Sequence, residues 1–465
     1  MNGLACGIGL LALMAGATVE ADAQSVTNIA AFKGLAPVSA LSNTPAGKAA
    51  LAANFTVTGG IQTGVIRQPT LLPFSEQQQQ ALRDAFITDS NLTQLADGLG
   101  VALGGAYQAR AHYSDRDHST DISDAVKNVI AYANSTSGAD SNASKYFFAN
   151  GTKDGKVPVS DEALAIFKAV GGGPDPFGVA YGRPAGSPGA DVYGNSRPFQ
   201  TEPRILPIVG PDYFNVPADN EVYNRGPIMN LINSPSFPSG HTTYGYMGSL
   251  LLAVLVPERY REMVIRGAEY GNDRIVVGAH YAMDVLGGRT LATYDLAHLL
   301  ANDPAYMNRP LRNVATMTVT SDVQVPSTIG DFRAAVERAR ADLDKTLEAA
   351  CGGTVAVCAR ADTGRFNAPA MNEAFYLSTQ TYGLPVTHPE TADTIEDVGA
   401  LAPEAGNLLT AAFPKLTLDE ANRILTETEG PGGGFLDDGS AFGVYSRLNL
   451  YAAASRADAV SRAKP

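Results

Sequence analysis

Two short stretches of the sequence carry residues that suit chemistry on an anion. Residues 238–241 read Pro-Ser-Gly-His and precede an apolar run, so Ser239 can cap a helix whose first N–H groups face an anion. Gly240 has no Cβ, which lets the backbone approach a ligand closely. The imidazole of His241 stands on the rim of this cradle and can carry a proton.

Arg274, His280 and Asp284 form the second stretch. Positions four apart share a helix face, so Asp284 is predicted to accept a hydrogen bond from one nitrogen of His280. That contact would leave the other nitrogen with a free lone pair, as a histidine nucleophile requires. Arg274 and the upstream Arg197 offer planar guanidinium groups that suit phosphate. The set predicts phosphoryl transfer, because it supplies donors, a nucleophile and an acid.

At these residues the chain resembles the superfamily of type 2 phosphatidic acid phosphatases, bacterial class A acid phosphatases and vanadium haloperoxidases. That superfamily carries K-x6-R-P, then P-S-G-H, then S-R-x5-H-x3-D. The second motif is intact at residues 238–241, and the third is intact except for Asp273 in the place of Ser. The first motif keeps its Arg-Pro pair at Arg197, but Ala190 occupies the position of the Lys.

The resemblance implies an all-α fold, a helical bundle of the acid phosphatase and vanadium haloperoxidase type. It implies His280 as nucleophile, Asp284 as the residue that orients it, and His241 as general acid. The implied phosphate pocket consists of Arg197, Ser239, Gly240 and Arg274.

The missing Lys leaves one cation of that pocket unassigned. Arg183 lies in the same loop as Ala190 and is a candidate phosphate-binding residue. A different Lys or Arg, or water, is the alternative.

The sequence therefore predicts an acid phosphatase that hydrolyses phosphomonoesters through a phosphohistidine, with no metal and no other cofactor. A vanadium-dependent haloperoxidase, with vanadate held at His280, is the alternative, and the missing Lys argues against it. A binding module whose pocket has decayed at Ala190 is a third interpretation. A metal site at the two histidines and Asp284 is disfavoured, because the neighbouring arginines would repel a cation.

Composition limits the partners. The 465 residues contain 34 Lys and Arg against 47 Asp and Glu, a formal net charge of −13, which disfavours nucleic acid and anionic lipid as partners. The expected partner is a small phosphomonoester substrate. The apolar run at residues 247–256 ends at Pro257 and is shorter than the roughly 18 residues of a membrane span, so it predicts a buried helix.

The N-terminal residues 1–23 are predicted to be a signal peptide, since an apolar run leads to a small-x-small site at Ala21 and Ala23. The usual positive region is missing, because no Lys or Arg precedes Lys33. A periplasmic or secreted protein is expected, and Cys351 and Cys358 are predicted to form a disulfide rather than two separate buried thiols.

Helical signals dominate the rest of the chain. Helix starts are predicted at the capping patterns that begin with Ser75, Ser160 and Thr417. Apolar residues recur at helical spacing from Phe332 to Leu347. Residues 239–300 predict two or three packed helices, with breaks at Pro257 and at the Gly-Asn-Asp sequence of residues 271–273, whereas the Gly- and Pro-rich residues 171–198 predict a long loop.

Two regions are expected after the signal peptide: a catalytic helical bundle at residues 24–308 and a mostly helical extension at 309–465. The boundary falls before residues 316–325, which predict a short strand or a linker. The polar cluster around His112 and His118 is assigned no role, and neither are His298 and His388. Residues 430–434 lack the Lys of a P-loop and predict a turn, which could form the rim of a pocket.

Overall fold

The computed structural model describes residues 24–66, 72–87, 92–112, 122–202, 205, 207–309 and 328–465. Three predictions lie outside these ranges: the signal peptide at residues 1–23, the part of the polar cluster at His118, and the strand or linker at 316–325.

The N-terminal half consists of helices joined by shaped loops, with one small hairpin. The helices are α1 (Val26–Leu35), α2 (Pro45–Gln62), α3 (Phe74–Asp84), α4 (Val101–Gln108), α5 (Asp124–Asn150), α6 (Asp161–Val170), α7 (Pro176–Ala180), α8 (Pro198–Thr201) and α9 (Asn220–Asn224), with 3-10 turns η1 (Ala36–Asn43) and η2 (Gln94–Leu99). Strands β1 (Val209–Pro211) and β2 (Pro217–Asp219) pair antiparallel. The fold is all-α, as predicted.

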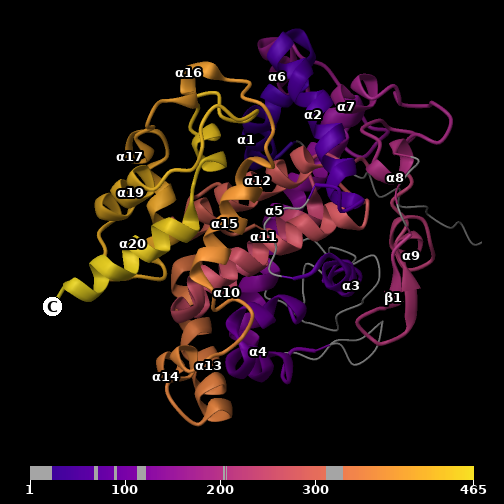
Figure 1. Ribbon diagram of the computed structural model, residues 1–465. Helices are drawn as coiled ribbons and strands as arrows, with labels where there is room; N and C mark the ends of the chain where they lie inside the picture. Colours follow the sequence, from indigo (N-terminus) through magenta and orange to yellow (C-terminus); the bar gives the residue numbers. More distant parts are fainter. Residues whose placement is uncertain are drawn as a thin grey trace, which may run out of the picture.

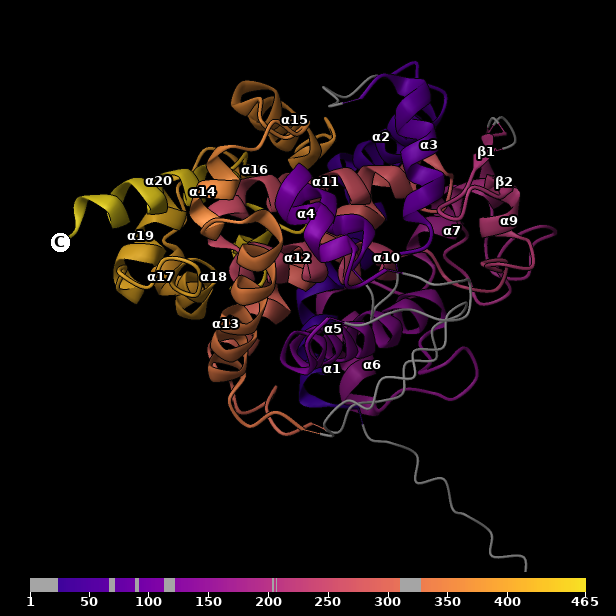
Figure 2. The same cartoon turned by 90° about the horizontal axis from the view of Figure 1, so that it is seen from below.

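Three helices, α10 (Gly240–Leu255), α11 (Tyr260–Val276) and α12 (Ala282–Leu300), occupy the middle of the molecule in both views (Figures 1 and 2). The short 3-10 turn η3 (Pro257–Arg259) separates α10 from α11, which confirms the break at Pro257. The predicted break at residues 271–273 is wrong, because α11 continues through them. A Cβ on Gly271 would lie 2.9 Å from Val285, so this glycine allows helices to approach each other instead of ending one.

The C-terminal region is helical, as predicted. It contains α13 (Phe332–Cys351), α14 (Val355–Arg360), α15 (Pro369–Thr381), α16 (Pro389–Ala392), α17 (Val398–Leu401), α18 (Asn407–Thr410), α19 (Leu418–Glu427) and α20 (Leu450–Ala463), with 3-10 turns η4 (Pro403–Gly406) and η5 (Gly443–Ser446). A disulfide between Cys351 and Cys358 joins the end of α13 to α14, which confirms that pairing.

Local capping signals were accurate in two of three cases. Ser160 accepts a hydrogen bond from Ala163 N at the start of α6, and Thr417 accepts one from Glu420 N at the start of α19. The start predicted at Ser75 is wrong. The N-cap residue of helix α3 is Pro73, two residues before Ser75, and its carbonyl accepts a hydrogen bond from Gln77 N.

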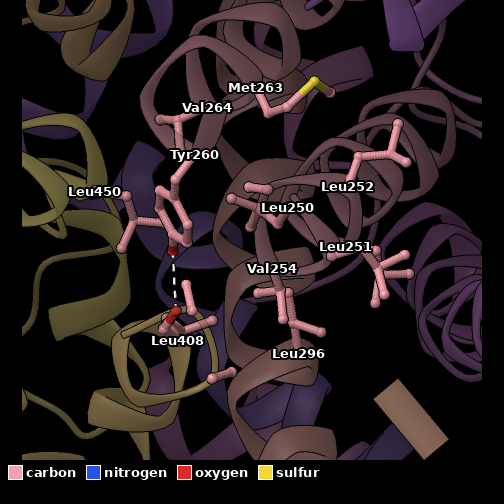
Figure 3. Packing of buried hydrophobic residues seen from close by; sticks show 14 of the residues in the cluster. Leu250, Leu251, Leu252, Val254, Tyr260, Met263, Val264, Leu296, Leu408 and Leu450 are labelled. Atoms are coloured by element: carbon pink, nitrogen blue, oxygen red, sulfur yellow. Dashed lines mark hydrogen bonds between the residues drawn. The ribbon is translucent and has the colours of Figure 1, made fainter. Parts of the chain in front are cut away.

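The C-terminal helices share a hydrophobic core with the central ones. Figure 3 shows Leu408 and Leu450 beside Tyr260 and Val264 of α11, and the Tyr260 hydroxyl donates a 3.1 Å hydrogen bond to Leu408 O. The predicted boundary near residue 309 thus separates parts of the chain that bury their apolar side chains together.

Helix α10 is buried along nearly its whole length, in agreement with the prediction for residues 247–256. Within the described ranges, no helix combines the length and hydrophobicity needed to cross a bilayer.

Candidate active site

The first turn of α10 forms one wall of the site. Ser239 is the N-cap residue, and its Oγ accepts a hydrogen bond from Thr242 N at 3.0 Å, as predicted. The N–H groups of the first helical turn have no intrahelical partner, so those of Gly240 and His241 can bind an anion. Ser239 N donates to the carbonyl of Asp284 at 3.0 Å, which ties this turn to α12.

His280 lies in the turn between α11 and α12, and not on a helix as the spacing had predicted. Helix α11 ends before Gly278, whose φ of +79° reverses the chain, and the N–H groups of Ala279 and His280 both donate to Arg274 O. Asp284 is the third residue of α12 and accepts a hydrogen bond from Tyr281 N at 2.8 Å. The turn still brings Nδ1 of His280 to 3.4 Å from Oδ2 of Asp284.

Ser236 is a member of this cluster that the sequence did not reveal. Its hydroxyl donates to Oδ2 of Asp284 and lies 3.3 Å from Nδ1 of His280. The same carboxylate oxygen therefore holds a serine hydroxyl, a backbone N–H and the imidazole. The only sequence signal for Ser236 is its place two residues before Pro238.

Arg197 determines which nitrogen of His280 carries the proton. The Nη1 group of Arg197 donates to Nε2 of His280 at 2.9 Å and to Ala279 O at 3.1 Å. Because a guanidinium only donates, Nε2 must present its lone pair, and the proton is on Nδ1, facing Asp284. The remaining donors of Arg197 bind Ser234 and Pro235, so the guanidinium is fixed in place.

His241 faces the same nitrogen. Its Nδ1 lies 3.2 Å from Nε2 of His280, and its Nε2 lies 3.3 Å from the sulfur of Met229. The side chains of both histidines and of Arg197 are buried.

Burial and the surrounding cations favour the neutral form of both histidines. The pKa of His280 lies well below its usual value because of burial first and Arg197 second. Burial, followed by the charges of Lys145 and Arg197, likewise lowers the pKa of His241 well below its usual range. Burial raises the pKa of Asp284 to about 6, against the hydrogen bonds from Ser236 and Tyr281.

Comparison with known proteins agrees with this arrangement. Residues 187–303 match the PAP2 superfamily. The chain is 44% identical over 69 residues to a non-specific acid phosphatase of Salmonella typhimurium strain LT2, and 37% identical over 84 residues to an acid phosphatase of Zymomonas mobilis. A non-specific acid phosphatase of Providencia stuartii is 36% identical over 72 residues.

Residues 187–303 belong to the PAP2 superfamily. The similarity to the curated relatives is confined to a segment. It covers 15%, 18% and 16% of this chain and 28%, 32% and 29% of the Salmonella, Zymomonas and Providencia proteins, respectively. The chain thus spans about a third of the length of these relatives.

Arg274 is buried in the last turn of α11. Its Nη2 donates to Ala81 O at 2.9 Å, and its guanidinium stacks on Tyr270 with 4.8 Å between Cζ and the ring centre. Its charge also lowers the pKa of both histidines, but less than burial and the charges of Arg197 and Lys145 do.

Asp273, which replaces the usual Ser, is buried next to Arg274. Burial and the neighbouring carboxylates of Asp84 and Glu269 raise its pKa well above the usual range. In its protonated form it would offer an O–H donor, as a serine does.

Arg183 is not brought to the cluster. Its guanidinium donates to Pro188 O at 3.3 Å within the same loop. Ala190 is buried, and its neighbour Asp191 has a pKa raised to about 6 by burial. The residues of this loop outside α7 form turns, as predicted.

Lys145 of α5 lies outside the matched residues 187–303 and is a further cation beside the histidines, and no sequence signal pointed to it. Its side chain is buried, and burial, followed by the charge of Arg197, lowers its pKa to about 7. A Cβ on Gly240 would lie 3.1 Å from Lys145 Nζ, so the ammonium borders the first turn of α10.

The other candidates lie apart from the cluster. His298 bonds Asp303 at 2.7 Å and approaches Glu404 at 3.3 Å, and His388 lies 3.0 Å from Glu390. Residues 430–434 form an irregular loop, so the turn predicted there is not found, and Pro431, Gly432 and Gly434 line a cavity of about 210 Å³ beside α12. Nowhere in the described ranges do three His, Cys, Asp or Glu side chains gather as a metal site.

Proposed function

We propose that this protein is an acid phosphatase that hydrolyses phosphomonoesters through a phosphohistidine on His280, without a metal or other cofactor. The observation that carries the proposal is the lone pair of His280 Nε2. Asp284 and Ser236 hold the opposite nitrogen, while Arg197 and His241 face the lone pair. This is the arrangement of an oriented nucleophile inside a cationic pocket.

In the first step, Nε2 of His280 attacks phosphorus, the P–N bond forms and the P–O bond to the leaving group breaks. His241, in its protonated state, gives the proton on Nδ1 to the leaving oxygen. The imidazole of His280 becomes positively charged, and Asp284 stabilises that charge through the proton on Nδ1.

In the second step, water attacks phosphorus and the P–N bond breaks. His241 accepts the proton that the water loses, so inorganic phosphate leaves and both histidines return to their starting states. Throughout, phosphoryl oxygens are bound by Arg197, Arg274, the capping turn at Ser239 and the N–H groups at Gly240 and His241.

The lowered pKa values of His280 and His241 agree with an enzyme whose activity is highest at acid pH. His280 must be neutral to attack, and its lowered pKa favours that form. His241 must be charged to act as an acid, and its lowered pKa favours that form only at low pH or when a phosphate dianion is bound nearby.

We further propose export to the periplasm or the medium, with a mature N-terminus near Gln24. The disulfide at Cys351 supports this, because disulfides persist in oxidising compartments. Mass spectrometry of the native protein should find that N-terminus and no free thiol at Cys351 or Cys358.

The purified protein should be assayed with a chromogenic phosphomonoester from about pH 4 to 8 in the presence of a chelator. Turnover that is highest in acid and insensitive to the chelator is expected. A parallel assay measures halide oxidation with added vanadate. Halide oxidation without phosphate release would identify a haloperoxidase, and no turnover in either assay would identify a binding protein.

A further inference from the structure

The phosphate pocket needs a cation that the sequence motif does not provide. Position 190 holds a buried alanine, and the guanidinium of Arg183 is engaged within its own loop. The lysine and arginine charges that lower the pKa of both histidines are those of Lys145, Arg197 and Arg274. Of these three, Lys145 is the one that lies outside the recognised motifs.

Lys145 projects from α5 to the anion-binding end of α10. A Cβ built on Gly240 would lie 3.1 Å from Nζ and 3.3 Å from Cε of Lys145, and 3.3 Å from Oγ of Ser141. Ser141 lies one helical turn before Lys145, on the same face of α5. The ammonium therefore borders the N–H groups that are free to bind an oxyanion.

The side chain of Lys145 has no partner of its own. It is 7% exposed, and no hydrogen bond or ion pair in the described part of the chain holds its ammonium. Oγ of Ser141 is buried and equally without a partner. A buried ammonium without a counter-ion is costly, so its presence next to the nucleophile points to an anionic ligand.

We propose that Lys145 is a catalytic residue that binds a phosphoryl oxygen of the substrate, supplying from α5 the cation that position 190 lacks. This inference rests on the proposed phosphatase function and assigns one more residue to its pocket. Ser141 is placed to hydrogen-bond the same oxygen or the ammonium.

The electrostatic surroundings agree with such a role. Burial and Arg197 lower the pKa of Lys145 to about 7, and the carboxylates of Asp284 and Asp191 oppose this change. The neutral His241 and His280 also face it. A bound phosphate dianion would raise the pKa of Lys145 again, so binding above about pH 7 should be accompanied by proton uptake.

The test compares Lys145→Met with Lys127→Met. Lys127 is on the same helix but pairs with Asp124 at 2.8 Å, near the helix start, and so controls for loss of a lysine from α5. Binding of inorganic phosphate is measured by calorimetry at pH 6, and kcat/KM with a phosphomonoester. Lys145→Met should weaken phosphate binding about 10- to 100-fold and lower kcat/KM by about 10²-fold or more. Lys127→Met should match the wild type.

Thermal unfolding adds a readout that a structural role would not produce. Phosphate should raise the Tm of the wild type and of Lys127→Met but not that of Lys145→Met. Without phosphate, Lys145→Met should melt no lower than the wild type, because the substitution removes an unpaired buried charge. Lys145→Gln, which retains a polar end, is measured as a second neutral variant.

The inference is overturned if Lys145→Met and Lys145→Gln bind phosphate and turn over within twofold of the wild type. It is also overturned if both variants melt well below the wild type without phosphate while keeping their phosphate-dependent rise in Tm. A loss of phosphate binding and turnover in Arg183→Met, with Lys145→Met unaffected, would overturn it as well. A wild type that neither binds phosphate nor hydrolyses the ester contradicts the proposed function itself.

Discussion

Arg266 and Arg197 are both buried guanidinium groups in the central part of the protein, and their partners differ in kind. Arg266 binds both carboxylate oxygens of Asp84 at 2.7 Å and Oδ1 of Asp97 at 2.6 Å. Arg197 binds carbonyl groups, a serine hydroxyl and His280, and it bonds to no carboxylate in the part of the chain that the structure describes. Arg365 joins the Arg266 group through Asp97 and Glu269.

The ionisation of the two groups follows from these partners. Burial alone would lower the pKa of Arg266, but Asp84 and Asp97 raise it well above its usual value. Burial lowers the pKa of Arg197 to about 10 and that of Lys145 to about 7, with no carboxylate in direct contact. The Arg266 group bonds directly to carboxylates and holds α3, η2 and α11 together. In the histidine cluster, Arg197 and Lys145 have no directly bonded carboxylate among the described residues and can bind an anion.

The largest expected effect is on turnover. Because His280 is the proposed nucleophile, His280→Ala should lower kcat by about 10⁴-fold or more. Rapid-quench labelling should show acid-labile phosphate on the wild type alone, and circular dichroism should show an unchanged fold. Labelled phosphate on a serine, or near-normal turnover of the variant, would contradict the assignment.

Arg266→Met should act on stability instead. Removing the guanidinium leaves Asp84 without its arginine partner, while Asp97 keeps only Arg365. Breaking a buried ion pair in this way costs about 3 to 5 kcal/mol. Denaturant unfolding measures the loss. If Arg266 serves stability and not catalysis, the folded fraction of the variant should keep most of the wild-type kcat. A decrease in the free energy of unfolding of less than about 1 kcal/mol would mean that the pairing contributes little.

The stability of Lys145→Met relative to the wild type should change with pH in the direction opposite to that expected when a lysine in a stabilising ion pair is removed. Below about pH 7 the lysine is charged in both the folded and the unfolded protein, so the wild type bears the full cost of burying it. As the pH rises from about 7 toward 10.5, the folded state releases its proton first and wild-type stability increases relative to the variant. The variant should therefore be the more stable protein near pH 6, with the advantage shrinking in alkali. An advantage that stays constant across this range would contradict the lowered pKa.

The smallest effect concerns the general acid. His241→Ala should lower kcat/KM by about 10²-fold for an alkyl phosphate, whose leaving oxygen needs a proton. A nitrophenyl phosphate, whose leaving group needs none, should lose much less. With the wild type, the rate should fall as the pH rises through the titration of His241. Equal losses on both substrates would exclude His241 as the acid.

Local signals in the sequence predicted much of the fold and the centre of the site. The caps at Ser160 and Thr417 depend on residues three apart, and the apolar face of α13 on a regular repeat. His280 and Asp284 were predicted to meet, and they do, although through a turn at Gly278 that the helical spacing did not reveal.

What the sequence did not predict depends on tertiary contacts. Gly271 looked like a helix break because its role, close approach to Val285, involves a separate helix. Ser236 has no motif of its own, and it matters only because the turn folds back onto Asp284. Lys145 is far upstream of every motif, and nothing in the pattern of α5 indicates that it reaches Gly240.

The position of Lys145 beside Gly240 has a consequence for the evolution of this pocket. If one lysine is enough, positions 145 and 190 should covary: relatives with Lys at the position of Ala190 should tolerate a small or apolar residue at that of Lys145. Gly240 should be retained wherever Lys145 is, because a Cβ at that position would lie 3.1 Å from the ammonium.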